Sequence, residues 1–512
     1  MCSIPPKRSG LDGEESSKKG MAMSSRSLLT HYTHLARIAA LALATTAIGC
    51  SGEDAGQGSD DVTDINNSKV KNQSIGNCWV YASIGWVESL RLTHAGEELN
   101  LSESYITYWH WFEQIHGGGG GERQLATMDF KDGANILGTG GWWGTAVEIM
   151  RRYGLLDEGK FIPEEAEEAR SSRQKSAQTA IDASLKSGAL STDEARRDAA
   201  IVRAELDKAW GLTPEVVGML DEVFGKDVSK TLYDASLALP ESSGLRRASS
   251  LKVGHDKSGK ELTLEDAIGQ PSFSGWGPPT RTGTYAWNEK SYPGTATARR
   301  TFQIELQTAM HNRLPAIMTW FVDFAALKPD NTFREVPASP GRQGGHMTVV
   351  EDYQITNVPG HGTLPAGELV TDPAILEAAL SPEAKLEFIR IKNSWGSSLS
   401  PDPNQGDALK GYYDLYMAYL DARIPQTEGG ATNGLSGVVL PPATFFSGGG
   451  TNEGEEPVGG CAHDLCATGS VLEASCDPCV AKIAEADPFC VENSWDDVCV
   501  GEVGSVCNQT CN

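Results

Sequence analysis

Apolar residues recur at helical spacing directly after a cysteine in the first fifth of the chain. The apolar positions are Trp79, Val80, Ala82, Trp86, Val87 and Leu90. Intervals of three and four residues place such positions on one face of a helix. The residues just before the cysteine, 74–77, favour a turn. The pattern therefore predicts that Cys78 stands where a loop enters a helix.

Two later segments have the alternation of β-strands. After a pair of glycines, His346 opens an apolar run that reaches Val350. Residues 388–392 alternate in character and run directly into Asn393. Alternation with a period of two is typical of a half-buried strand. We therefore expect a histidine at the start of one strand and an asparagine just after another.

A segment of helical composition lies between these regions. Residues 160–238 are rich in Ala, Glu, Lys and Arg, and residues 191–194 have the chemistry of a helix cap. A narrow apolar stripe follows at Ala195, Ala199, Val202, Leu206 and Trp210. Such a helix packs on one side only. The segment could wall one end of a cleft, but the narrow stripe slightly favours a solvated addition.

Composition and charge narrow the class of protein. The 512 residues exceed the usual size of one core, so we expect about two to four domains. With 39% hydrophobic residues the chain can build a sizeable core. The net charge of −25 disfavours nucleic acid as a partner, because nucleic acid needs clustered Lys and Arg. No run reaches the roughly 18 apolar residues of a membrane span.

The N-terminal region has the features of an export signal. The run Ile38–Ile48 is too short to cross a bilayer but fits the core of a signal peptide, and Met21 or Met23 is the better start because acidic residues precede them. The segment that ends at Cys50 resembles the lipobox of bacterial lipoproteins, whose cysteine is acylated. The alternative is an ordinary signal peptide cut near Ala47. We expect an outer-membrane or cell-surface lipoprotein, or an extracellular protein, with membrane contact through the lipid anchor only.

Three residues of these segments have the chemistry of a nucleophilic site. The N–H groups and dipole at a helix start favour a Cys78 thiolate, the form that attacks carbonyls. His346 could accept the thiol proton, with the Asn393 oxygen holding the imidazole in the required tautomer. The amide of Gln73 could donate to an oxyanion beside the sulfur. Cys78 and Asn393 alone are more simply structural, and His346 alone fits a core or a catalytic histidine equally well. The order Cys, His, Asn along the chain favours catalysis, and we expect the cysteine to be a free thiol.

The segments around these residues resemble a known family. The blocks NQSIGNCW, GGHMTVV and IKNSWG look like the three signature blocks of papain-like cysteine peptidases, in the same order. Further segments are similar to blocks of the bleomycin hydrolase and aminopeptidase C branch, namely Leu101–Trp109, Gly140–Trp143 and Tyr153–Leu155. Gly411–Tyr413 resembles the closing GY strand of the papain-like family. The resemblance covers roughly residues 68–425.

The resemblance implies an α+β, two-lobed papain-like fold, with a helical lobe and a β-barrel-like lobe on either side of a cleft. It implies Cys78 as the nucleophile and His346 as the general base and then the acid. Asn393 would orient the imidazole, and Gln73 would donate to the oxyanion. Gln73 lies five positions before the cysteine, where the family usually has six, so Asn72 is the alternative donor. No cofactor or metal is expected.

The expected function is hydrolysis of peptide bonds in peptide or protein substrates through a thiol acyl-enzyme. In the bleomycin hydrolase branch the C-terminus lies in the cleft and makes the enzyme an aminopeptidase. Here the chain continues beyond Pro425, which favours an endopeptidase. The alternatives are an aminopeptidase, a catalytically inactive papain-like surface binding protein, and acyl or amide transfer by the same thiol.

The C-terminal part differs from the rest in its cysteines. Gly-rich residues 426–460 predict a flexible linker. Beyond it lie Cys461, Cys466, Cys476, Cys479, Cys490, Cys499, Cys507 and Cys511. An even count at this density predicts a disulfide-stapled module whose pairing the sequence does not choose, and disulfides are favoured over zinc for the CxxC pair. The module resembles small Cys-rich modules appended to secreted proteins of myxobacteria.

The predicted organisation follows from these patterns. The segments are a signal peptide (1–49), an acidic tether (50–66), a helical lobe with the nucleophile (67–159), a helical insertion (160–265), a β-rich lobe with His346 and Asn393 (266–425), a flexible linker (426–460) and a Cys-rich module (461–512).

Overall fold

The computed structural model describes residues 65–119, 136–272, 280–397, 409–447 and most of 465–507. The predicted signal peptide, the lipidation site at Cys50 and all of the acidic tether except residues 65 and 66 lie outside these residues. Among the residues described, no helix is both long and apolar enough to cross a membrane.

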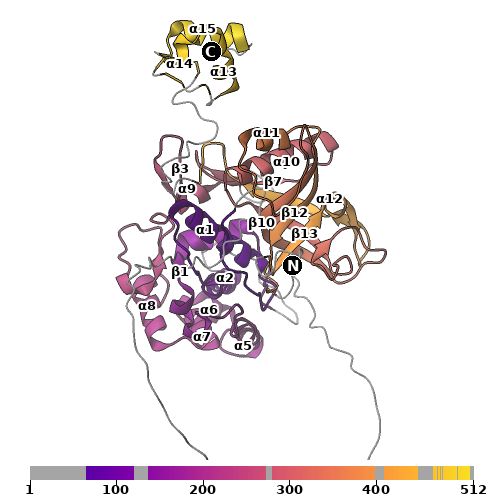
Figure 1. The fold of residues 1–512 in the computed structure, drawn as a ribbon. Coiled ribbons are helices and arrows are strands. Elements are labelled where there is room, and N and C mark those ends of the chain that lie inside the picture. The colour runs from indigo at the N-terminus through magenta and orange to yellow at the C-terminus, as the bar shows by residue number, and fades with distance from the viewer. Residues whose placement is uncertain are drawn as a thin grey trace, which may run out of the picture.

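Helices dominate the first half of the described chain (Figure 1). They are α1 (Cys78–Ala95), α2 (Glu103–Gly118), α3 (Trp143–Tyr153), α4 (Glu158–Phe161), η1 (Pro163–Glu165), α5 (Gln174–Ser187), α6 (Asp193–Arg197), α7 (Ala199–Trp210), α8 (Pro214–Phe224) and η2 (Glu241–Ser243). Helix α1 is buried over most of its length and contacts α2, α3 and strand β10 (Gln343–Val358). The element that carries the cysteine therefore lies between the helices and the sheet.

The helical insertion is part of the core, not the solvated addition that its narrow stripe favoured. Helix α7 contacts α2 and α5, and Leu206 and Trp210 are fully buried in the main hydrophobic cluster. Ile181 of α5 is buried in the same cluster. The apolar stripe looked narrow because its residues are divided between two helices, α6 and α7. Asp198 caps α7 through the N–H groups of the first turn and separates it from α6.

The second half is built on a sheet of eight strands (Figure 1). Its order is β7 (Asn288–Ser291), β16 (Leu435–Leu440), β8 (Ile317–Asp323), β10, β12 (Lys385–Lys392), β13 (Tyr412–Tyr416) and β9 (Thr332–Phe333), with β11 (Gly362–Leu364) on β10. Among the described strands of this sheet, only β13 and β9 pair in parallel. The described strands form an open path from β7 to β9, so the expected barrel is not closed.

Shorter elements surround this sheet. Helices in this half are α9 (Leu264–Ile268), α10 (Ala296–His311), α11 (Pro373–Ala379) and α12 (Met417–Leu420). The small two-stranded sheets are β1 (Leu155–Leu156) with β2 (Leu245–Arg246), β3 (Lys252–His255) with β4 (Glu261–Thr263), β5 (Gln270–Ser272) with β6 (Thr280–Thr282), and β14 (Arg423–Pro425) with β15 (Ala431–Asn433). The mixture of helices and sheet agrees with the predicted α+β class.

The sheet extends into the segment predicted as a linker. Gly429 and Gly430 have positive φ angles of 94° and 83° and turn the chain between β14 and β15. Strand β16 then pairs with β7 and β8 through an apolar stretch that is mostly buried. The linker prediction was therefore wrong for residues 431–440, because the two glycines form a hairpin turn instead of a flexible chain.

The Cys-rich segment has its own small core. It contains α13 (Pro478–Ala486), α14 (Phe489–Glu492) and α15 (Asp497–Cys507). Disulfides join Cys479 to Cys507 and Cys490 to Cys499, and Cys466 is also disulfide-bonded. Trp495 is fully buried in this core. The disulfide of Cys479 confirms disulfide chemistry over zinc at that cysteine, whereas Cys461, Cys476 and Cys511 lie outside the described residues.

Candidate active site

Cys78 is the first residue of α1, as its sequence context predicts. Asn77 precedes the helix, and its side chain makes no capping bond to the first turn. The first turn also holds no acidic residue that would oppose a negative sulfur. The helix start therefore favours the thiolate form of Cys78, which is buried at 1% exposure.

The expectation that Cys78 is a free thiol does not hold in this structure, where its sulfur is disulfide-bonded. A helix start stabilises the thiolate, and the thiolate is also the form that enters thiol–disulfide exchange. The tendency that would make this sulfur a nucleophile thus also makes it prone to oxidation. Reduction of the sulfur must precede any attack on a carbonyl.

His346 and Asn393 meet across two neighbouring strands. His346 lies near the start of β10, and Asn393 directly follows β12, which pairs with β10 in antiparallel register. The Nε2 atom of His346 lies 2.8 Å from Oδ1 of Asn393. Both side chains are buried, at 2% exposure each. The structure thus brings together two residues that are 47 positions apart in the sequence.

The bond to Asn393 fixes the state of the imidazole. Oδ1 accepts hydrogen bonds, so Nε2 of His346 carries the proton and Nδ1 carries the lone pair. Nδ1 is buried without a hydrogen-bond partner among the described residues. Burial also lowers the pKa of His346 to about 4. The ring is therefore neutral at pH 7 and has a nitrogen available to accept a proton.

Trp395 covers the imidazole. Its ring stacks on His346 with a centroid distance of 4.6 Å and an interplanar angle of 21°. Trp320 of β8 meets the same imidazole edge-on at 5.6 Å. The two indoles restrict the access of water to the bond between His346 and Asn393, which strengthens that bond.

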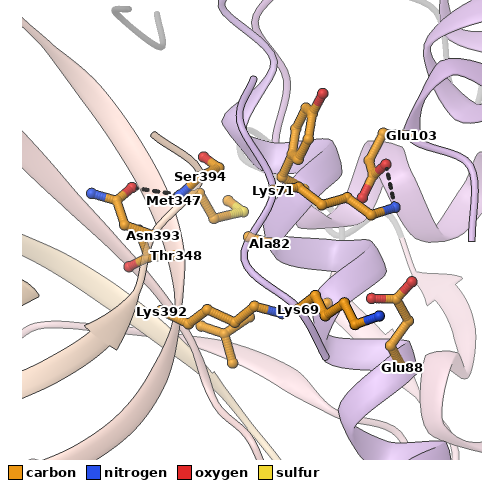
Figure 2. Close-up of a pocket in the computed structure, with 13 residues that line it drawn as sticks. Lys69, Lys71, Ala82, Glu88, Glu103, Met347, Thr348, Lys392, Asn393 and Ser394 are labelled. Atoms are coloured by element: carbon orange, nitrogen blue, oxygen red, sulfur yellow. Dashed lines mark hydrogen bonds and ion pairs between the residues drawn. The ribbon is translucent and has the colours of Figure 1, made fainter. Parts of the chain in front are cut away.

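Helix α1, which begins at Cys78, packs against strand β10, which carries His346. A Cβ atom on Gly85 would lie 3.5 Å from Val349. Cys78 is about 10 Å before Gly85 along the helix, and His346 is about 10 Å before Val349 along the strand. In Figure 2 Ala82 of α1 lies near Met347 of β10, and both residues line the same small pocket. Cys78 and His346 thus lie on two elements that are in contact with each other.

Gln73 is held between the cysteine loop and the Asn393 turn. Its Oε1 accepts a hydrogen bond from Ser394 Oγ at 2.7 Å, and its Nε2 donates to the carbonyl of Ile75 at 2.9 Å. The Gln73 N–H also donates to the Ser394 carbonyl. Asn72, the alternative donor, forms an isolated bridge with Trp395. Both candidates border the turn after Asn393, and the choice between them stays open.

The insertion supplies a residue that the sequence did not suggest. Gln174, at the start of α5, is fully buried, and its Oε1 accepts hydrogen bonds from Asn77 at 3.2 Å and from Ser74 at 3.2 Å. Asn77 also donates to Thr107 of α2 at 3.0 Å. The first residue of α5 therefore fixes the loop that leads into Cys78. In the sequence, only a glutamine at the start of a predicted helix could have indicated this role of Gln174.

A buried cluster of charged residues lies behind the site (Figure 2). Lys71 Nζ binds Glu103 at 2.9 Å and Glu158 at 2.6 Å. Lys392, just before Asn393, donates from Nζ to Ser68 Oγ at 2.7 Å, and Ser68 in turn donates to Glu88 of α1. These bonds link the chain before the cysteine loop to α1 and to β12.

Burial and neighbouring charges set the protonation of this cluster. Burial lowers the pKa of Lys392 to about 8, although Glu88 opposes the shift. Burial also lowers the pKa of Lys71, but Glu103 and the other nearby carboxylates outweigh it, so the net pKa is raised. Burial raises the pKa of Glu88. The cavity among these side chains is about 20 Å³, room for a single water, so it is not a substrate site.

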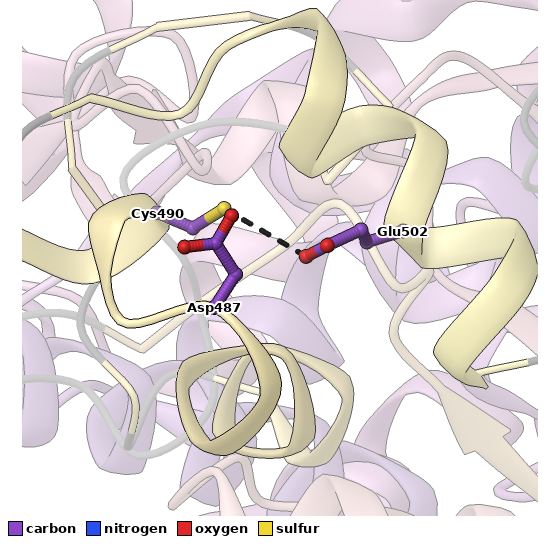
Figure 3. A group of neighbouring side chains, drawn as sticks. All are labelled: Asp487, Cys490 and Glu502. Carbon is purple, nitrogen blue, oxygen red and sulfur yellow. Dashed lines mark hydrogen bonds between the residues drawn. The ribbon is translucent and has the colours of Figure 1, made fainter.

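The one group of possible metal ligands among the described residues is in the Cys-rich segment (Figure 3). It consists of Asp487, Cys490 and Glu502, whose ligand atoms lie within 4.8 Å of one another. The Cys490 sulfur is in a disulfide with Cys499 and cannot act as a thiolate ligand. The two remaining carboxylates do not make a metal site.

Comparisons with known proteins give a family match for the C-terminal segment only. Residues 459–511 match a family described as a domain of unknown function, DUF8252. No curated protein sequence matches the chain. Three solved structures share 12% identity with it and cover 74% of it. They are PepW from Lactobacillus rhamnosis (81% of that chain, TM-score 0.35), xylellain, a cysteine protease from Xylella fastidiosa (84%, 0.26), and SERA5E from Plasmodium falciparum (91%, 0.23). These TM-scores are low, so the function must be argued from the site.

Proposed function

We propose that this protein is a cysteine peptidase that hydrolyses peptide bonds through an acyl-enzyme on Cys78. The observation that carries the proposal is the 2.8 Å bond between His346 and Asn393, which leaves the buried Nδ1 of the imidazole as a proton acceptor. A cysteine at a helix start, on an element packed against the strand of that histidine, supplies the nucleophile.

Each step of the proposed reaction uses an atom of this site. After reduction, Nδ1 of His346 takes the thiol proton, and the Cys78 sulfur attacks the carbonyl carbon of the peptide. The N–H groups at the helix start and the Gln73 amide stabilise the resulting oxyanion. The imidazolium then gives its proton to the leaving amine, and the C–N bond breaks. Water, deprotonated by His346, attacks the thioester and releases the acid and the thiol.

The amide of Gln73 must turn for this role. In the present structure its Nε2 donates to Ile75, a residue of its own loop. Its Oε1 stays bonded to Ser394, which ties the side chain to the Asn393 turn. A rotation that keeps the bond to Ser394 would free the N–H groups for an oxyanion. Asn72 is the alternative donor at the same turn.

Two finer proposals accompany this one. Endopeptidase action is supported by the chain after Pro425, which enters β15 and then β16, a strand inside the sheet. Export as a lipoprotein acylated on Cys50, at the cell surface or outside the cell, is supported by the N-terminal sequence alone. A substrate class of peptides or proteins follows from the chemistry of acyl transfer.

The second candidate is a catalytically inactive binding protein of the same architecture. The disulfide on Cys78 is the observation that favours it, because a sulfur in a disulfide does not attack a carbonyl. The two functions differ in what happens when that sulfur is reduced.

The test is cleavage of a mixed peptide library by the full chain, with and without a thiol reductant. Cys78→Ala and His346→Ala are the inactivating variants, and Cys466→Ala controls for the loss of a disulfide elsewhere. We expect cleavage by reduced wild type and by the control, with loss of at least about 10³-fold in the two site variants. Products cut inside the peptides indicate an endopeptidase, and single residues removed from the N-terminus indicate an aminopeptidase.

An absence of cleavage by the reduced protein, with Cys78 shown by mass to carry a free thiol, would overturn the peptidase proposal. The same peptides would then be tested for binding without cleavage, which the second candidate predicts.

A further inference from the structure

A stack of side chains leads from His346 to the surface. The indole of Trp395 lies 4.6 Å from the imidazole, and Phe324 packs on the indole at 5.1 Å with an angle of 38°. The guanidinium carbon of Arg342 lies 4.3 Å from the centre of the Phe324 ring. Burial decreases along the stack from His346 to Phe324, which is half-buried, and Arg342 is exposed.

The position of Arg342 along the strand also places its side chain on the same side as His346. Arg342 precedes β10, and its carbonyl accepts a hydrogen bond from the Phe324 N–H at 2.9 Å, which continues the pairing of β8 with β10. Residues 342 and 346 are four positions apart, so their side chains leave the strand on the same face. Arg342 is thus on the face of the sheet that carries the imidazole.

The chemistry of His346 indicates which half of the substrate lies on this side of the site. The imidazolium gives its proton to the leaving amine, so the leaving half of the substrate must lie beside the ring. The stack begins on that ring. Its successive separations of 4.3, 5.1 and 4.6 Å place the guanidinium within about four residues of an extended peptide, which advances about 3.3 Å per residue.

The positive charge of Arg342 is not neutralised by an ion pair within the described part of the chain. Among the described residues, no carboxylate forms an ion pair with Arg342, and its guanidinium donates no hydrogen bond. Arg334 is a useful contrast, because its guanidinium also lies over a ring, Tyr416 at 4.5 Å, but binds Asp330 at 3.3 Å. An uncompensated cation beside the leaving-group side stands out in a chain with a net charge of −25.

We propose that Arg342 selects substrates with a carboxylate on the leaving-group side, within about four residues of the scissile bond. The proposal rests on the peptidase function proposed above. Phe324 holds the guanidinium by a cation–π contact, so its N–H groups are pre-positioned for a planar carboxylate. The carboxylate can come from an Asp or Glu side chain or from the C-terminus of the substrate, and the experiment separates these sources.

The test compares peptides that share one cleavable sequence. One set is amidated at the C-terminus and carries Glu or Gln at the second or third residue after the scissile bond. A second set keeps Gln there and ends in a free carboxylate or an amide. We expect kcat/KM to be about two- to fivefold higher for the peptide with the carboxylate, as for an exposed ion pair, and the ratio to fall at high salt.

The variants locate the effect. Arg342→Gln should remove the preference while its kcat/KM for the neutral amidated peptide stays at the wild-type value, which also shows that the variant is folded. Arg334→Gln, the matched control, should keep the preference. A response in the Glu set assigns a side-chain carboxylate, and a response confined to the free-terminus set assigns the substrate C-terminus.

Two kinds of result would overturn the inference, and they differ in whether the peptidase function is refuted as well. Turnover with equal rates for charged and neutral peptides, or a preference that survives in Arg342→Gln, refutes the role of Arg342 alone. An absence of turnover in every set, with Cys78 reduced, refutes the peptidase function and the inference with it.

Discussion

Replacing Asn393 by alanine tests how the imidazole of the site is held. The Asn393 oxygen is the acceptor for His346 Nε2 at 2.8 Å, and both groups are buried. Without it a buried N–H loses its acceptor, which costs about 1–3 kcal/mol. The proton is then free to move to Nδ1, which would remove the lone pair that takes the thiol proton. At about 1.4 kcal/mol per tenfold change in rate, kcat/KM should fall about 5- to 150-fold.

Asn393→Asp gives the opposite electrostatic change at the same position. A carboxylate keeps an acceptor beside Nε2 and raises the pKa of the imidazole above its value of about 4 in this structure. The wild-type acid limb of kcat/KM should lie near pH 4, and that of Asn393→Asp should move to higher pH. Asn288→Ala is the control, since this amide bonds to backbone groups of Arg281 and Ala286 and should leave the profile unchanged.

The assay is hydrolysis of the best library peptide by reduced protein across pH 4–9, with the free energy of unfolding measured by urea in parallel. Wild-type kcat/KM in a folded Asn393→Ala protein would refute the orienting role of Asn393. An acid limb that stays in place in Asn393→Asp would refute the assignment of that limb to His346.

Three further predictions concern stability, each measured by urea unfolding. Gly141→Ala should cost about 1–3 kcal/mol, because its Cβ would lie 2.5 Å from the Trp79 ring, and a wild-type midpoint would contradict this packing. Burial lowers the pKa of His110 to about 3, so below pH 6.5 the unfolded chain binds a proton that the folded chain does not. The free energy of unfolding therefore decreases as the pH is lowered, by up to about 1.4 kcal/mol per pH unit. His110→Gln should therefore reduce the slope between pH 6 and 4, and an unchanged slope counts against a neutral buried ring. Asp414→Asn should cost about 3–5 kcal/mol, since Arg390 would keep a buried charge without its 2.8 Å partner, and a loss under 1 kcal/mol would contradict that.

Local patterns in the sequence predicted the elements that carry the site. The turn and the apolar spacing around Cys78 placed it correctly at the start of a helix. The alternation after His346 and before Asn393 placed both at the ends of strands, and the structure adds that those strands are neighbours. Such features depend on residues within a few positions of one another, which a single sequence displays directly.

The parts that the sequence did not predict depend on residues far apart in the chain. Lys392, Ser68 and Glu88 form one hydrogen-bonded chain, although 324 positions separate Lys392 from Ser68. Gln174 reaches the cysteine loop from the insertion, 97 positions from Asn77. No periodic pattern in the sequence indicates such contacts, because each of these polar residues alone could equally lie on the protein surface.

The linker and the sulfur were misjudged for different reasons. Two adjacent glycines suit both a flexible chain and a hairpin turn, and only the pairing of β14 with β15 decides between them. The absence of cysteine from 79–460 suggested a free thiol at Cys78, but spacing in the sequence carries no information on the redox state of a sulfur.

The most direct test of the central claim is covalent labelling of reduced protein with an epoxide inhibitor of thiol peptidases, read by the mass of the peptide that contains Cys78. The account predicts one adduct on Cys78 in wild type, formed at least about tenfold more slowly in His346→Ala, which lacks the base. An unlabelled Cys78 that still reacts with a small thiol reagent, or equal labelling rates in the two proteins, would contradict it.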